Sequence, residues 1–242
     1  MSSVRAMAWM RALLIITPAA ILGCGSSSTP GESVLHPLDL ELPDEAESFD
    51  ADNVLSSVEF ADTSDATLVK LNEFLANTPY GTASFLSNYR AGSVSASSAL
   101  MHAATAFGVH PAALLARLEM EQGLVALTRY PPTAARVEYV FRCGCAGAEC
   151  DPALAGLDKQ LDCMALRWAN ARDRIAREGA TLGGWSIGME KESTDGVLVT
   201  PNNAATCAMY EELGEVGDGS RGTSLFYAVF TRYRSALSSG AK

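Results

Sequence analysis

A glutamate near the end of an apolar helix is the residue of this chain best suited to acid–base chemistry. Glu121 lies near the end of the stretch 107–125, which is rich in leucine and alanine. At about 100° per residue, Glu121 lies about 20° from Leu114, at the margin of the apolar stripe, whereas Glu119 lies about 140° from Leu114, further towards the polar side. A carboxyl group against an apolar surface tends to keep its proton near neutral pH and can give it to a leaving oxygen. The alternative interpretation is an ordinary solvated glutamate.

The helix that carries Glu121 is one of several that the sequence predicts. Pro111 suits a first helical position because its missing N–H costs nothing there, and Gly108 suits the end of the helix before it. Other helices are expected over residues 68–76, 83–89, 96–107 and 157–178, from Thr200-Pro201 through Tyr210, and over 224–237. The fold class is therefore mainly α, with an irregular cysteine-bearing region and a loop or short β-hairpin within 181–199.

The first residues have the layout of an export signal. Arg5 and Arg11 precede the apolar run 12–16, and the sequence Ile21-Leu22-Gly23-Cys24 resembles a bacterial lipobox. The run is too short, and too interrupted by Pro18, to span a membrane. We predict a lipoprotein signal peptide over 1–23 and lipidation of Cys24, which implies a membrane anchor in the cell envelope. The alternative is a secreted protein that is cut nearby.

An acidic tether is expected over residues 24–65, followed by one domain over 66–238 and a tail over 239–242. Eleven of the 28 acidic residues fall in the tether, which holds no lysine or arginine. The remainder then carries 17 acidic residues against 16 basic ones once the two signal arginines are set aside, so the domain is near neutral. The domain has no basic stripe that could neutralise phosphates, so we expect no nucleic-acid partner.

Five cysteines remain besides Cys24, and their spacing favours disulfides over a metal site. They are Cys143, Cys145, Cys150, Cys163 and Cys207. No histidine lies near them and the spacing matches no zinc template, so we expect no metal and no cofactor. Two disulfides are expected, with Cys143 and Cys145 each reaching Cys150, Cys163 or Cys207. We predict Cys207, which looks like a buried helix position, to be the unpaired thiol.

A set of ordered motifs carries a family resemblance. The motifs are Thr78-Pro79-Tyr80-Gly81, Gly108-Val109-His110-Pro111, Glu121-Gln122-Gly123-Leu124-Val125, Cys150-Asp151-Pro152, Gly156-Leu157-Asp158-Lys159-Gln160 and Thr200-Pro201-Asn202-Asn203-Ala204-Ala205-Thr206 followed by Tyr210. Their order and spacing resemble secreted bacterial lysozyme-like proteins, relatives of the glucosaminidases and soluble lytic transglycosylases that cut peptidoglycan. The resemblance covers about residues 68 to 235 and implies a lysozyme-like helical domain.

The resemblance places Glu121 on the family's catalytic glutamate. It also implies that Gln122, Gln160, Asn203, Thr206 and Tyr210 line the sugar groove. Four of these residues have a structural alternative: Gln160 as a helix-surface amide, Asn203 and Thr206 as helix-start residues bound to their own backbone, and Tyr210 as a core aromatic. Cys143 and Cys207 are extra to the family pattern, which leaves a Cys143–Cys207 pair as another disulfide option.

Lytic transglycosylases use one glutamate first as acid and then as base, while the sugar's 6-hydroxyl closes an anhydro ring. The resemblance therefore implies cleavage of the β-1,4 bond between N-acetylmuramic acid and N-acetylglucosamine by Glu121. If a second carboxylate takes part, as most glycosidases require, the candidates are Glu138, Asp158 and Asp195.

One departure from the family pattern motivates a different function. After Tyr210 the family commonly continues with a Thr-Pro-aromatic segment, where this chain reads Glu211-Glu212-Leu213-Gly214-Glu215. The competing hypothesis is a lipoprotein that binds or scaffolds the cell wall without cutting it. A third hypothesis is a structural lipoprotein with no affinity for glycans.

Overall fold

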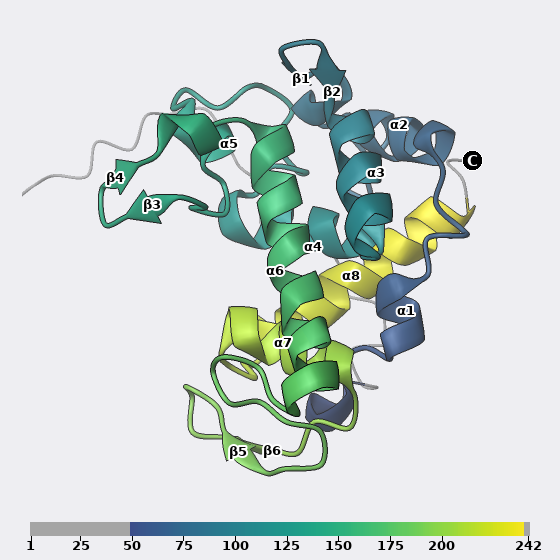
Figure 1. Cartoon of the computed structure of the whole chain (residues 1–242). Helices are drawn as coiled ribbons and strands as arrows, with labels where there is room; N and C mark the ends of the chain where they lie inside the picture. Colours follow the sequence, from purple (N-terminus) through teal and green to yellow (C-terminus); the bar gives the residue numbers. More distant parts are fainter. Residues whose placement is uncertain (1–48, 240–242) are drawn as a thin grey trace, which may run out of the picture. The chain divides into compact units, whose positions relative to one another are not determined.

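The computed structural model describes residues 49–239, which are mainly helical with three short antiparallel strand pairs (Figure 1). The described residues all belong to one compact unit. The predicted signal peptide over 1–23 and the lipidation residue Cys24 lie outside the described residues. The helices are α1 (Ser57–Ala61), α2 (Leu68–Ala76), α3 (Ala96–Phe107), α4 (Pro111–Gln122), α5 (Ala135–Glu138), α6 (Leu157–Glu178), α7 (Ala204–Leu213) and α8 (Gly222–Ser239). The strands are β1 (Arg90–Ala91), β2 (Val94–Ser95), β3 (Cys145–Ala146), β4 (Glu149–Cys150), β5 (Lys191–Glu192) and β6 (Leu198–Val199), and single 3-10 turns are η3 (Ala51–Asn53), η4 (Phe85–Ser87) and η5 (Pro152–Leu154).

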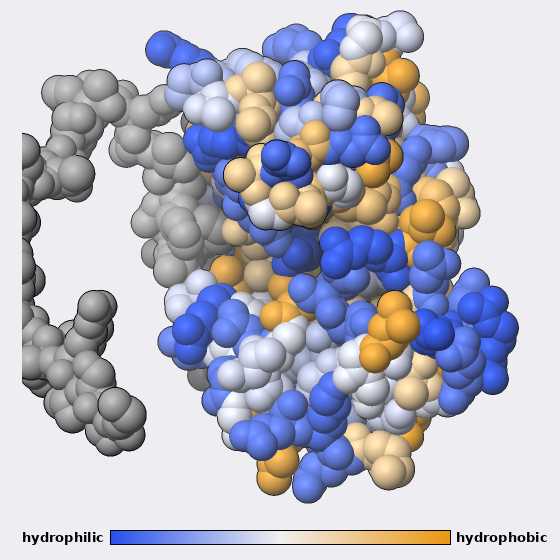
Figure 2. Space-filling model, turned by 60° about the vertical axis from the view of Figure 1, so that its left-hand side comes forward, coloured by the Kyte–Doolittle hydropathy of each residue, from blue (hydrophilic) through white to orange (hydrophobic). Residues whose placement is uncertain are grey.

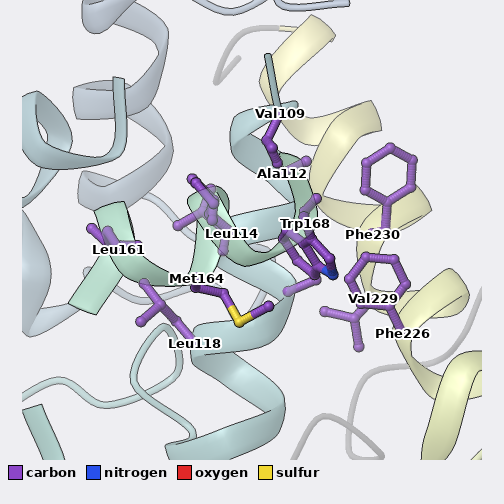
Figure 3. Close-up of a cluster of buried hydrophobic side chains, with 14 of the residues drawn as sticks. Val109, Ala112, Leu114, Leu118, Leu161, Met164, Trp168, Phe226, Val229 and Phe230 are labelled. Carbon is purple, nitrogen blue, oxygen red and sulfur yellow. The ribbon is translucent and has the colours of Figure 1, made fainter. Parts of the chain in front are cut away.

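Helix α4, which carries Glu121, runs through the interior. Every residue from Pro111 to Glu119 is buried, and the helix packs against α8, α3 and α6. Figure 3 shows the apolar side chains that α4, α6 and α8 bring together, among them Leu114, Leu118, Met164, Trp168, Phe226 and Phe230. A helix with neighbours on several sides has no solvated face over most of its length. Only its last turn reaches the surface.

The ends of the central helices follow local signals, as predicted. Pro111 is the first residue of α4, and Gly108 and Gly123 end α3 and α4 in the left-handed conformation, with φ of 61° and 64°. The predicted ranges 68–76, 96–107 and 157–178 match α2, α3 and α6.

The helix predicted over 83–89 is wrong. Only one 3-10 turn forms there, because the backbone of Ser84 is extended (φ −69°, ψ 147°). The N–H of the next residue, Phe85, donates to the carbonyl of Leu127 at 2.7 Å.

The expectation of a tether that reaches residue 65 also needs correction. Val54 and Phe60 are fully buried, and Ser56 and Glu59 form a reciprocal capping box at the start of α1. The carbonyl of Phe60 accepts from the N–H of His110 at 2.6 Å, which ties this segment to the start of α4. Residues 49–65 are therefore part of the folded domain. Composition suggested a tether because the few apolar residues of this segment are widely spaced among acids.

The cysteine region is held by two disulfides, Cys143–Cys163 and Cys145–Cys150. The first joins the irregular region to α6, and the second closes the β3–β4 hairpin at residues that face each other in the register. Cys207 is buried in α7 without a disulfide partner, and burial raises the pKa of its thiol to about 11. The prediction of two disulfides with Cys207 left free is confirmed, and the Cys143–Cys207 alternative is not what forms.

The predicted short hairpin within 181–199 is present. Strands β5 and β6 pair antiparallel, with Lys191 opposite Val199 and Glu192 opposite Leu198. The helix after it, α7, begins at Ala204, later than predicted, and runs to Leu213. No helix among the described residues is long and apolar enough to cross a membrane.

Candidate functional site

Glu121 lies in the last turn of α4 and lines a hollow of about 310 Å³, called here the Glu121 hollow. Its side chain is 34% exposed, so it is neither in the core nor fully in solvent. The hollow is also lined by Arg117 of α4, by Glu212 of α7, and by Glu215, Ser220 and Arg221 of the loop before α8. Met120, Leu213 and Leu225 supply its apolar part.

The carboxylate of Glu121 is paired with Arg117, one helical turn earlier. The Nη2 group of Arg117 donates to Oε1 of Glu121, the i,i+4 geometry that brings helix side chains together. The Arg117 side chain is only 9% exposed, and its buried Nε has no hydrogen-bond partner. Burial lowers the pKa of Arg117, while the charges of Glu121 and Glu212 act in the opposite direction. The hollow therefore contains a buried cation with one donor still unused.

A second carboxylate, Glu212, lies in the same hollow. Its side chain is 6% exposed and faces Arg167 of α6, whose Nε and Nη2 lie 3.0 and 2.7 Å from its two oxygens. Burial raises the pKa of Glu212, and the charges of Arg167 and Arg117 oppose that rise. Glu212 belongs to the segment that departs from the family pattern, and it was not among the predicted second carboxylates. The sequence signal that could have pointed to Glu212 is the acidic pair Glu211-Glu212, which closely follows Tyr210.

The predicted second carboxylates lie elsewhere. Glu138 and Asp158 line a different hollow, of about 490 Å³. Asp195 accepts hydrogen bonds from the hydroxyl of Ser193 at 2.6 Å and from the N–H groups of Val216 and Gly217 at 3.1 and 2.8 Å. These bonds, above all the one from Ser193, lower the pKa of Asp195 to about 2. Asp195 thus fastens the loop before α8 and remains ionised.

The prediction that Glu119 faces the polar side of the helix is wrong. Glu119 is 1% exposed, and its Oε1 accepts from the hydroxyl of Tyr80 at 2.7 Å. Its Oε2 accepts from the N–H groups of Val125 and Ala126 at 2.8 and 3.0 Å. A single apolar stripe would leave Glu119 on a polar face, but α4 has neighbours on several sides. Glu119 therefore holds the chain that follows α4 back against the helix.

Gln160, a predicted groove residue, is fully buried and uses both ends of its amide within the protein. Its Oε1 accepts from the N–H groups of Phe141 and Cys143 at 3.2 and 3.1 Å. Its Nε2 donates to the carbonyls of Cys143 and Leu154 at 3.1 and 2.8 Å. It fastens the disulfide region to α6 and presents no group to a ligand.

The late motif has a similar structural role. Asn203 caps α7, with its Oδ1 accepting from the N–H groups of Ala205 and Thr206 at 2.9 and 3.0 Å. The hydroxyl of Thr206 donates to the carbonyl of Leu55 at 3.3 Å, and that of Tyr210 donates to the carbonyl of Ala51 at 3.0 Å. The groove assignment of these residues is corrected to anchoring of the segment before α1. In the structure Asn203 lies at the start of a helix and Tyr210 is a core aromatic, as in the alternative interpretation.

Gln122 is the one predicted groove residue next to Glu121, although it does not line the Glu121 hollow. Its Oε1 accepts from Nε of Arg136 at 3.2 Å, and its carbonyl accepts from Nη2 of Arg136 at 2.6 Å. Gln122 thus joins the end of α4 to α5.

With this geometry in place, the chain was compared with protein-family models, curated proteins and solved structures. None matches. Within residues 49–239, no group of three or more histidine, cysteine, aspartate or glutamate side chains is placed to hold a metal ion. The Glu121 hollow is therefore the feature from which a function can be proposed.

Proposed function

We propose that this chain cleaves the glycan strands of peptidoglycan, at the β-1,4 bond between N-acetylmuramic acid and N-acetylglucosamine, with Glu121 as general acid and then base. The observation that carries the proposal is the Glu121 hollow, where an accessible carboxylate lies beside a second, buried carboxyl group and a buried arginine. Glycoside cleavage needs a carboxyl group that can move a proton and a surrounding that supports positive charge on the sugar.

A second carboxylate compensates Arg117 during the proposed cycle. Glu121 must be protonated when it acts as an acid, which removes its charge from Arg117. Glu212 also acts on Arg117 and is nearly buried, so Arg117 keeps one compensating carboxylate when Glu121 is neutral. Donation of this proton to the leaving oxygen leaves Glu121 as a carboxylate, which can pair with Arg117 and then take a proton from the incoming hydroxyl.

The polar character of the surface supports a sugar-rich ligand. The face drawn in Figure 2 is mainly hydrophilic, and its apolar residues form small separate groups. The proposed partner is the peptidoglycan strand, and the proposed location is the cell envelope, with attachment to a membrane through lipid on Cys24.

The test is release of soluble muropeptides from purified sacculi. The Glu121→Gln variant keeps an acceptor for Arg117 but cannot donate a proton, so we expect its rate to fall by about 10² or more. The matched control is Glu73→Gln on α2, an exposed glutamate outside the hollow, which we expect to keep the parent rate. Equal rates for Glu121→Gln and the parent would rule out the proposed role of Glu121.

A second candidate function is a wall-binding lipoprotein without turnover. The observation that favours it is the ion pairing of every carboxylate in the hollow, Glu121 with Arg117, Glu212 with Arg167 and Glu215 with Arg221. Sedimentation of the parent protein with sacculi, in parallel with the muropeptide assay, separates the two functions. Binding without soluble products supports the scaffold, and products that disappear in Glu121→Gln support the enzyme.

A further inference from the structure

A second hollow, called here the Tyr130 hollow, lies among four segments of the fold. It has a volume of about 490 Å³, within the range of ligand sites. Arg90 of β1 and Tyr89, the residue just before β1, line this hollow, and Tyr130 lines it from the loop after α4. The remaining charged residues in its wall are Glu138 at the end of α5 and Asp158 and Lys159 in the first turn of α6.

Two tyrosines form a fixed aromatic wall in this hollow. The rings of Tyr89 and Tyr130 are nearly parallel, at 10°, with their centroids 5.9 Å apart. The buried ring of Phe85 meets both edge-on, at 5.9 Å from Tyr89 and 5.8 Å from Tyr130. Tyr130 is nonetheless 47% exposed. A large aromatic surface is thus held in place and left open, which lowers the entropic cost of binding a ligand against it.

The charged side chains around this wall have unused bonding capacity. Among the described residues, the side chains of Glu138, Asp158 and Lys159 make no ion pair and no hydrogen bond, and Arg90 has one bond, to the carbonyl of Ser93 at 3.2 Å. The carboxylates lie close to the rings: burial raises the pKa of Tyr89, and the charges of Tyr130, Glu138 and Asp158 add to the rise. The hollow therefore combines an apolar platform with acceptors and donors of both signs.

We propose that the Tyr130 hollow binds a sugar unit of an amino-sugar chain, with one face of the pyranose ring stacked on Tyr130. The axial C–H groups of a pyranose ring are weakly positive and suit the negative face of an aromatic ring. Glu138 and Asp158 accept hydrogen bonds from hydroxyl or acetamido N–H groups. Arg90 and Lys159 donate to carbonyl oxygens or to the carboxylate of a muramic acid. The choice of an amino sugar rests on the proposed function, whereas the platform and its polar rim do not.

Arg136 links the Tyr130 hollow to the helix end that carries Glu121. Its side chain on α5 binds Gln122, the residue after Glu121, and Glu138 of the same short helix lines the hollow. A glycan held at Tyr130 would therefore be bound by segments attached directly to the last turn of α4.

The experiment measures the Kd of a tetramer of N-acetylglucosamine by calorimetry. The parent for this test is the full chain with Glu121→Gln, so that no turnover occurs. We expect saturable binding, a rise in Kd of about tenfold or more for added Tyr130→Ala, and a change of less than about threefold for Tyr130→Phe, which keeps the ring. Leu182→Ala, a highly exposed residue outside the hollow, is the matched control and should leave Kd unchanged.

Two results overturn the inference. One is an unchanged Kd in Tyr130→Ala with far-UV and near-UV circular dichroism like that of the parent. The other is no binding of the tetramer at millimolar concentration by a folded parent. Neither result depends on catalysis, since muropeptide release by the unmodified chain tests the proposed function separately. Release of muropeptides without tetramer binding would retain the Glu121 proposal and remove this one.

Discussion

Glu119 and Glu121 are two residues apart on α4, but one lies inside the protein and the other at its surface. Glu119 accepts hydrogen bonds from the Tyr80 hydroxyl and from two backbone N–H groups after the helix. Glu121 is paired with the side chain of Arg117 and lines an open hollow. Both are carboxylates on the same helix, so their surroundings alone decide what each can do.

This difference shows how carboxylates that stabilise the fold can be distinguished from carboxylates that can take part in catalysis. The Tyr80 hydroxyl and the backbone donors hold the Glu119 carboxylate in place and leave it little capacity for a ligand. A side-chain partner on Glu121 can move when a substrate enters, and solvent reaches part of its carboxylate. Buried and fully hydrogen-bonded carboxylates should therefore matter most for the free energy of unfolding, and half-exposed ones for turnover.

The largest effect on stability is expected for Glu119→Ala. Loss of this side chain leaves two backbone N–H groups and the Tyr80 hydroxyl without their acceptor and opens a cavity, so we expect the free energy of unfolding to fall by about 3–5 kcal/mol. Urea denaturation followed by circular dichroism measures it. A loss below about 1 kcal/mol would mean that Glu119 does not hold this turn.

Tyr80→Phe should have the next largest effect, because it removes one donor to Glu119 and keeps the ring. The Tyr80 hydroxyl also accepts from that of Tyr233 at 3.2 Å, so the variant breaks a short chain of hydrogen bonds. We expect the free energy of unfolding to fall by about 2 kcal/mol, the scale of a hydrogen bond to a charged group. In the Glu119→Ala background the same change should cost clearly less, and full additivity in this double-mutant cycle would count against the coupling.

Much of the fold could be predicted from the sequence because its signals are local. Pro111, Gly108 and Gly179 mark helix ends through their own backbone properties, so α3, α4 and α6 could be bounded from the chain alone. The expectation that Cys207 stays unpaired came from its helical position, and it is confirmed.

The site could be predicted only in part, because its partners come from distant segments. Arg117 is one turn before Glu121 and could have been named from the i,i+4 spacing. Glu212 enters the hollow only through the packing of α7 against α6 and α8, which no local pattern records. The burial of Glu119 was missed for the same reason, since it depends on Tyr80 and on the neighbours of α4.

Asp195 gives an intermediate case, a carboxylate with fixed donors close to the surface. Its pKa of about 2 lies below the ordinary value of 3.8, so its contribution to stability is present above pH 3.8 and is lost as the pH falls through about 2. Because solvent screens this site, we expect Asp195→Asn to lower the free energy of unfolding by only about 1 kcal/mol at pH 7. Urea denaturation of both proteins at several pH values should show the difference vanish between about pH 4 and pH 2. A difference that persists unchanged at pH 2 would assign the loss to shape rather than charge.

The smallest effect on stability is expected for Glu121→Gln, the substitution with the largest expected effect on turnover. Glutamine keeps an acceptor for Arg117, and Glu212 remains to compensate the buried guanidinium, so the free energy of unfolding should fall by about 0.5 kcal/mol. The double variant Glu121→Gln, Glu212→Gln removes both carboxylates that act on Arg117. Its loss should exceed the sum of the two single losses, because a buried cation is then left uncompensated. Urea denaturation of the four proteins measures this coupling. A loss of several kcal/mol in the single Glu121→Gln variant would place Glu121 with Glu119 as a structural carboxylate, and the contrast between them would no longer support a site in the hollow.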